Sequence, residues 1–163
     1  GLSNLLNNQT QSFISSSDYV TLLTIFARSQ YRRKDNGTQI PWIDENLNPF
    51  TGDWISRTIL KQRNRLPEER GRDYNHSSFC DLIINGLVGI RPQEGNKLVI
   101  NPLVPEGYWD YFCLDNVSYH GRTICVLYDK TGEKYNKGTG LSIFIDGQRV
   151  TSSPTLKRIS CEL

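Results

Sequence analysis

The spacing of hydrophobic residues changes once along the chain, close to Pro92. Before this point apolar residues recur every three or four positions, as on a helix, and after it they recur at every second position, as on a strand. We therefore expect an α+β protein, with helices over residues 1–92 and a small antiparallel β domain over residues 93–163.

The best-defined helix should begin at Ser15, where Ser15 and Asp18 form the pattern of a capping box. Apolar residues then recur at helical spacing and also fill much of the opposite side, so we expect a helix buried on most faces. The turn-forming sequence at residues 35–37 should end this helix. The basic cluster at residues 32–34 then lies at the helix C-terminus, where the helix dipole favours positive charge and no ligand is needed.

A second buried helix is predicted over about residues 77–89, with Ser78 and Asp81 as a capping pair. Cys80 is expected to be a buried free thiol on this helix. Gly86 lies within the apolar stripe and suits the close approach of a neighbouring helix, although glycine costs roughly 1 kcal/mol inside a helix.

The alternating pattern after Pro92 predicts five strands: residues 97–101, 108–114, 122–128, 141–145 and 156–163. Asp146-Gly147 is a strong signal for a two-residue hairpin turn. His120 should be a turn residue between two strands.

Composition excludes several classes of function. The chain of 163 residues has 37% hydrophobic and 22% charged residues, as an ordinary globular protein does. A net charge of +2 without a long basic run gives no reason to expect nucleic acid as a partner. No apolar run reaches membrane-spanning length, and the sequence shows no signal peptide. The cellular compartment stays open.

The cysteines and histidines do not form a metal-binding pattern. None of the four cysteines lies in a CxxC pair, and the two histidines are far apart in sequence, so we expect no metal site. Cys113, Cys125 and Cys161 fall in strand-like segments, where a disulfide among them stays an open alternative.

The loop over residues 41–54 concentrates chemistry in a segment rich in Asn, Pro and Gly. It holds two tryptophans and three acids: Trp42, Trp54, Asp44, Glu45 and Asp53. Carboxyl groups beside flat aromatic rings suit a site that binds or cleaves a sugar, since glycoside hydrolysis uses a pair of carboxyl groups. The alternative is a surface loop that its tryptophans anchor to a core.

A second cluster surrounds the start of the helix predicted near residue 77. Tyr74, Asn75 and His76 lie next to helix N–H groups that have no partner within the helix. They are either a set of groups that recognise sugar hydroxyls or an ordinary capped helix start with packed side chains.

Three segments together resemble the C-terminal part of the six-hairpin, (α/α)6-barrel glycoside hydrolases, in particular those related to glycoside hydrolase family 63 and mannosylglycerate hydrolase. The first is the loop from Trp42 to Trp54, similar to the family pattern E-N-x-x-P-x-T-G. The second is the segment 73–92, and the third combines residues 101–105 with residues 119–122.

The resemblance implies an architecture and a mechanism. The chain would consist of the last helices of an (α/α)6 barrel followed by a small antiparallel β-sandwich, and the rest of the barrel would lie upstream. Glu45 opens the loop motif and would be the general base of an inverting hydrolysis of an oligosaccharide or other glycoside, expected to be α-linked. Trp42, Trp54, Tyr74 and His76 would contact the sugar, and no cofactor is implied.

The catalytic acid of this family matches no residue of the chain and would come from the upstream part. We therefore expect the isolated chain to have no glycosidase activity. Two alternatives remain open: a non-catalytic module that binds carbohydrate or has a structural role, and an interaction domain without any role in sugar recognition.

Overall fold

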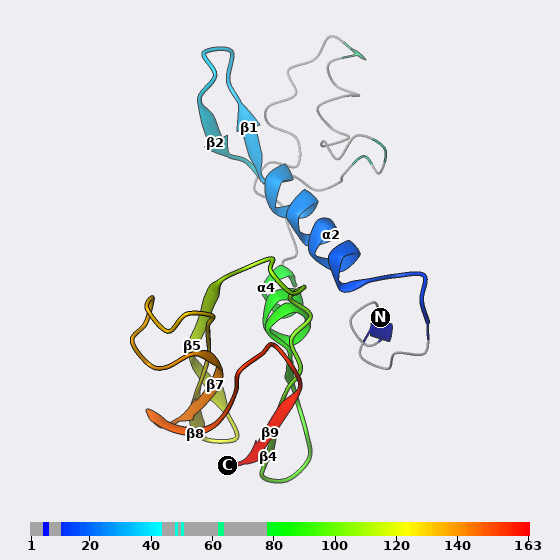
Figure 1. Cartoon of the computed structure of the whole chain (residues 1–163). Coiled ribbons are helices and arrows are strands. Elements are labelled where there is room, and N and C mark those ends of the chain that lie inside the picture. The colour runs from blue at the N-terminus through cyan, green and yellow to red at the C-terminus, as the bar shows by residue number, and fades with distance from the viewer. Residues whose placement is uncertain (1–4, 7–10, 44–47, 49, 51–61, 64–77) are drawn as a thin grey trace. The chain divides into compact units, whose positions relative to one another are not determined.

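The computed structural model describes residues 5–6, 11–43, 48, 50, 62–63 and 78–163 (Figure 1). These residues fall into two compact units that are described separately. One unit combines Gly1–Val20 with Ser78–Leu163, and the other contains Thr21–Ser77. Among the described residues, the structure is α+β, with few helices and a predominance of antiparallel strands.

Helix α2 covers Ser16–Ser29 and begins with the predicted capping box. The backbone N–H of Ser15 donates to Asp18 Oδ2 at 2.8 Å, and the N–H of Asp18 donates to Ser15 Oγ at 3.2 Å. This exchange satisfies two backbone donors at the helix start. The prediction of burial on most faces is wrong, because Leu22 is 58% exposed and Ile25 is 50% exposed.

Helix α2 also ends earlier than predicted. The chain turns at Gln30 into a hairpin of strands β1 (Tyr31–Arg33) and β2 (Gln39–Pro41), which pair in antiparallel fashion. The sequence at 35–37 is the tip of this hairpin, with Gly37 at a φ of 83°. The prediction that residues 32–34 lie at a helix C-terminus is therefore wrong.

The second helix begins as a single α-turn, α4 (Phe79–Asp81), and continues as a π-helix, η1 (Leu82–Val88). Ser78 makes no side-chain capping bond, so the predicted capping pair with Asp81 does not form. Cys80 is exposed, contrary to the buried thiol that the pattern predicts. The buried residues of this helix lie at its end, where η1 leads into the β domain.

Gly86 is closely packed, as its place in the sequence suggested. A Cβ atom at Gly86 would overlap the phenol of Tyr19, whose hydroxyl donates to the Leu82 carbonyl oxygen at 2.9 Å. The glycine therefore allows the start of α2 and the π-helix to approach each other.

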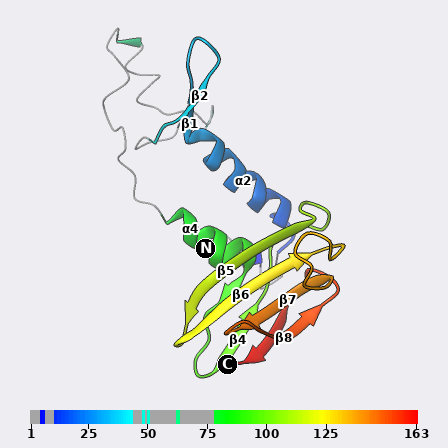
Figure 2. The ribbon, with the colours of Figure 1, turned by 90° about the vertical axis from the view of Figure 1, so that its left-hand side faces the viewer.

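The β domain consists of two antiparallel sheets (Figures 1 and 2). The three-stranded sheet has the order β3-β4-β9, with the bounds β3 Ile90–Arg91, β4 Lys97–Ile100 and β9 Ile159–Glu162. The four-stranded sheet has the order β5-β6-β7-β8, with the bounds β5 Tyr111–Tyr119, β6 Arg122–Asp129, β7 Gly140–Ile145 and β8 Gln148–Ser153. Figure 2 shows these four strands lying side by side in chain order.

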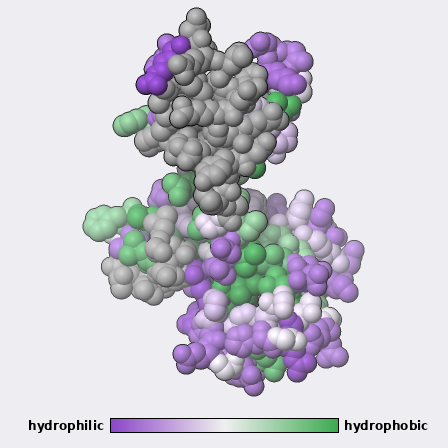
Figure 3. All heavy atoms as spheres, turned by 180° about the vertical axis from the view of Figure 1, so that it is seen from behind, coloured by the Kyte–Doolittle hydropathy of each residue, from purple (hydrophilic) through white to green (hydrophobic). Residues whose placement is uncertain are grey.

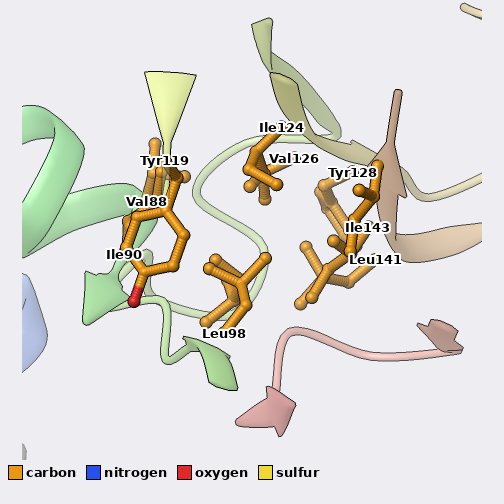
Figure 4. Close-up of a cluster of buried hydrophobic side chains, with 11 residues drawn as sticks. Val88, Ile90, Leu98, Tyr119, Ile124, Val126, Tyr128, Leu141 and Ile143 are labelled. Carbon is orange, nitrogen blue, oxygen red and sulfur yellow. The ribbon is translucent and has the colours of Figure 1, made fainter. Parts of the chain in front are cut away.

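The two sheets enclose one hydrophobic core, which makes the domain a small β-sandwich (Figure 4). Figure 4 shows Leu98 of the three-stranded sheet next to side chains of β6 and β7, while Ile90 lies beside Tyr119. Leu98, Ile124 and Ile143 are fully buried. Burying each such side chain stabilises the fold by roughly 1.5–3 kcal/mol, so this cluster is a major source of the domain's stability.

All five predicted strands occur, but several of their ends differ. Strand β5 extends to Tyr119 because a β-bulge lies between Leu114 and Val117. Asn116 adopts a positive φ of 59° in this bulge. The extra residue reverses the alternation, so that Leu114 before it and Val117 after it both pack against the core.

The hairpin turns agree with the sequence. Asp146 and Gly147 both have positive φ values, and they join β7 to β8. His120 and Gly121 do the same between β5 and β6.

Strand β8 is mostly polar and exposed, which explains why hydrophobic alternation does not reveal it. Figure 3 shows, among other apolar spots, an apolar area in the middle of the lower part of the face in view that hydrophilic residues border.

Candidate functional site

Only one of the five predicted site residues, Trp42, belongs to the described part of the chain. Glu45, Trp54, Tyr74 and His76 lie outside the described residues. Their roles as catalytic base and sugar contacts therefore stay predictions.

Trp42 directly follows β2, and its side chain is only 6% exposed. Its backbone N–H donates to the Gln30 carbonyl oxygen at 2.6 Å, which ties the end of the hairpin to the end of α2. The burial of the indole agrees with the anchoring alternative, and its contact with a sugar stays a prediction.

A second group of candidate residues lies in the β domain, where the sequence analysis predicted only a strand. An open hollow of about 450 Å³ is lined by five consecutive residues: Tyr108, Trp109, Asp110, Tyr111 and Phe112. Four of these five residues are aromatic, a density that could have indicated a binding surface. The alternating pattern alone gives no sign of it.

The backbone holds this segment in place at both ends. The N–H of Tyr108 donates to the Pro105 carbonyl oxygen at 3.1 Å, closing a turn in which Gly107 has a φ of 74°. On the other side, the N–H of Lys130 donates to the Asp110 carbonyl oxygen at 2.9 Å. The hollow is thus formed where β5 begins and β6 has just ended.

The rings along the hollow form a continuous series that reaches the core. Tyr108 and Trp109 have ring centroids 5.6 Å apart, and Trp109 meets Phe112 edge-on at 6.2 Å. Phe112 in turn lies 5.7 Å from Tyr128, a residue of the core cluster. Even so, Tyr108 is 46% exposed, Trp109 is 37% exposed and Tyr111 is 48% exposed.

Charged groups border these rings. Lys130 Nζ and Asp110 Oδ1 form an ion pair at 3.0 Å, and both side chains are more than half exposed. The hydrogen bond to the Asp110 carboxylate raises the pKa of Lys130, so the ammonium stays charged at neutral pH. Lys134 Nζ lies 4.6 Å from the centre of the Tyr111 ring, which also meets the ring of Tyr135 edge-on at 6.1 Å.

Two of the cysteines also meet in this sheet. Cys113 Sγ and Cys125 Sγ are 3.7 Å apart, on neighbouring strands β5 and β6, and both are free thiols. Burial, followed by the hydrogen bond to Cys113 and its negative charge, raises the pKa of Cys125 to about 12. Of the three cysteines among which the sequence left a disulfide open, Cys113 and Cys125 are in contact without forming one, and Cys161 is also free.

Within the described residues, no cluster of three or more His, Cys, Asp or Glu side chains is arranged to hold a metal ion. No helix in this part of the chain is both long and apolar enough to cross a membrane.

Two comparisons with known proteins bear on these features. Residues 90–152 match the family model for "Glycosyl hydrolase family 65, C-terminal domain". The chain is also similar, over 99% of its length, to a solved structure named "Sialidase", with 41% sequence identity and a TM-score of 0.82. It spans 14% of the length of that protein.

The matched segment begins at the first residue of β3 and ends within β8, so it includes the four-stranded sheet, the cysteine pair and the aromatic hollow. The β-sandwich is therefore similar to the C-terminal domain of a glycoside hydrolase.

Proposed function

We propose that this chain is the C-terminal part of an inverting glycoside hydrolase with an (α/α)6 barrel, and that Glu45 is its general base. The observation that carries the proposal is the match of residues 90–152 to the C-terminal domain of a glycosyl hydrolase family. The loop motif that begins at Glu45 and the resemblance to family 63 supply the finer assignment.

In the proposed reaction, the Glu45 carboxylate removes a proton from a water molecule as the water attacks the anomeric carbon. An acid from the upstream part protonates the leaving oxygen, and the two carboxyl groups stand roughly 6.5–9.5 Å apart to admit the water. Adjacent side chains on an extended backbone point to opposite sides, so Asp44 is assigned to bracing the loop. Trp42, Trp54, Tyr74 and His76 are assigned to the sugar.

The proposed division of the chain places barrel helices in residues 1–92 and the β-sandwich in residues 93–163. Strand β3 begins at Ile90 and pairs with β4, so the sheet itself starts slightly before this boundary. The remaining helices of the barrel would precede the chain.

The substrate class is a glycan or glycoside, with an α-linkage as the first expectation. The solved structure that resembles the chain is named a sialidase, which adds α-linked sialosides to the substrates worth testing. A panel of α- and β-linked hexosides together with sialosides would separate these possibilities.

The experiment uses a longer protein that contains this sequence together with its upstream barrel. We expect this protein to hydrolyse at least one member of the panel, and proton NMR of the early reaction should show the product with inverted anomeric configuration. The chain of 163 residues alone should give no turnover. Product with retained configuration, or enzyme-like turnover by the isolated chain, would contradict the proposed mechanism.

A non-catalytic carbohydrate-binding module remains the second candidate. The aromatic hollow in the β-sandwich favours it, because this hollow lies in the domain that is fully described and needs no upstream residues. The two candidates are compatible, since a hydrolase can carry a separate binding surface.

A further inference from the structure

We propose that the hollow formed by residues 108–112 is a non-catalytic binding site for a pyranose unit of a neutral glycan. The described residues that line this hollow all belong to the β domain, and Glu45 is not among them. The proposal therefore stands or falls separately from the hydrolase assignment.

The first argument is the exposure of the rings. Tyr108, Trp109 and Tyr111 are each more than a third exposed, although they lie within four residues and next to a well-packed core. Single exposed apolar residues are normal on protein surfaces, whereas a contiguous group of them marks a surface that something contacts. Tyr and Trp also suit a surface between an apolar core and solvent, because each combines an apolar ring with one polar group.

The second argument is that the site is preformed. Backbone hydrogen bonds hold Tyr108 and Asp110, and the Trp109 ring rests against Phe112, which packs on the core. Rings that are already immobile lose little conformational entropy when a ligand stacks on them. A weakly bound sugar can therefore be held by a few such contacts.

The third argument concerns size. The hollow of about 450 Å³ lies within the range of roughly 300–1,000 Å³ that is typical of small-ligand sites. A stable protein partner would instead need about 800 Å² of surface on each side. Five consecutive residues around a concave space fit one or two sugar rings better than a protein interface.

The fourth argument concerns polarity. A pyranose has an apolar face of C–H groups and a rim of hydroxyl groups that both donate and accept hydrogen bonds. The aromatic rings match the face, while the Asp110 carboxylate accepts hydrogen bonds and the Lys130 ammonium donates them. Because Lys130 is paired with Asp110 at 3.0 Å, its charge is less available to a phosphate, which favours a neutral sugar over a nucleic acid.

The test is a titration of the purified chain with a neutral α-linked oligosaccharide such as maltotriose, followed by NMR. The chain has three tryptophans, so the indole N–H signal of Trp109 is the one that disappears in Trp109→Phe. We expect this signal to shift in a saturable way as the oligosaccharide is added. A single-stranded oligonucleotide at the same concentration should leave it unchanged.

Three variants sharpen the result. Tyr108→Ala and Trp109→Ala should each weaken binding about tenfold, as expected when one anchoring aromatic residue is removed. Phe13→Ala is the matched control, because Phe13 is aromatic, 92% exposed and outside the hollow, and its binding should be unchanged. Thermal melting shows whether each variant is folded. If Trp109→Ala does not fold, the affinity of Tyr108→Ala decides the test.

The Glu45→Gln variant separates this site from the catalytic loop. Binding at the hollow should be the same in Glu45→Gln as in the original chain. If the Trp109 signal does not shift at millimolar oligosaccharide, if Phe13→Ala loses as much affinity as Tyr108→Ala, or if only the oligonucleotide moves the signal, the proposal is wrong.

Discussion

Tyr119→Phe should reveal how strongly the two sheets of the β-sandwich depend on one phenol. Tyr119 ends β5 in the four-stranded sheet and is 8% exposed. Its hydroxyl accepts a hydrogen bond from the Gln93 N–H at 3.0 Å and donates one to the Lys97 carbonyl oxygen at 3.1 Å. Gln93 lies in the segment that joins β3 to β4, and Lys97 is the first residue of β4, so the phenol links the two sheets.

Removing the hydroxyl while keeping the ring leaves two partly buried backbone groups without this partner. Each such loss costs about 1 kcal/mol, so the free energy of unfolding should fall by about 2 kcal/mol. With a urea dependence of roughly 2 kcal/mol per molar, the unfolding midpoint should fall by about 1 M. Urea titration followed by the β-sheet signal in far-ultraviolet circular dichroism measures this shift.

Tyr111→Phe is the control, because Tyr111 lies on the same strand but is 48% exposed. It should change the free energy of unfolding by less than about 0.5 kcal/mol. If Tyr119→Phe shifts the midpoint no more than Tyr111→Phe does, the hydroxyl does not tie the sheets together and the reasoning is refuted.

Two further predictions concern packing and thiol chemistry. Gly86→Ala places a methyl group against the phenol of Tyr19 and should destabilise the chain by about 1–3 kcal/mol in the same urea assay; an unchanged midpoint would mean that this close approach is not needed. The pKa of Cys125 is raised from the ordinary 9.0 to about 12, so its thiol keeps its proton until a higher pH. At pH 8 the fraction of Cys125 present as thiolate should therefore be roughly a thousandfold smaller than that of an ordinary thiol. Mass spectrometry after iodoacetamide treatment should find exposed Cys113 modified well before Cys125, and equal rates would contradict the raised pKa.

Local signals in the sequence predicted those features whose cause is also local. The capping box of Ser15 and Asp18 forms because both partners lie within one helical turn. The turn at Asp146-Gly147 forms because these residues tolerate a positive φ. The strands of the antiparallel β domain were predictable because a core on one side of each strand imposes the alternation, whereas the sandwich arrangement was implied by the family resemblance.

Features that depend on distant partners could not be predicted in this way. Helix α2 stops at Ser29 because the next residues pair across a hairpin, a preference that helical spacing does not show. The bulge at Asn116 interrupts the alternation, which is why the predicted strand ended at Leu114. The hollow at residues 108–112 depends on how much of each aromatic ring remains exposed after the neighbouring elements have packed. The local sequence does not show this.

The proposed catalytic site followed from a motif and from a family resemblance, neither of which supplies geometry. Glu45 lies outside the described residues, so its proposed role as general base has to be tested by measuring activity. Trp42 is the predicted site residue whose surroundings are described, and its burial fits a residue that anchors the loop.

The most direct test of the central claim is the turnover of Glu45→Gln in a longer protein that joins this chain to the proposed upstream barrel. Replacing the carboxylate by an amide removes the base while keeping the size of the side chain, so kcat should fall about 10²–10⁴-fold with little change in KM or melting temperature. Asp44→Asn, the adjacent control, should keep most of the activity. Near-normal kcat in Glu45→Gln would contradict the assignment of Glu45 as general base.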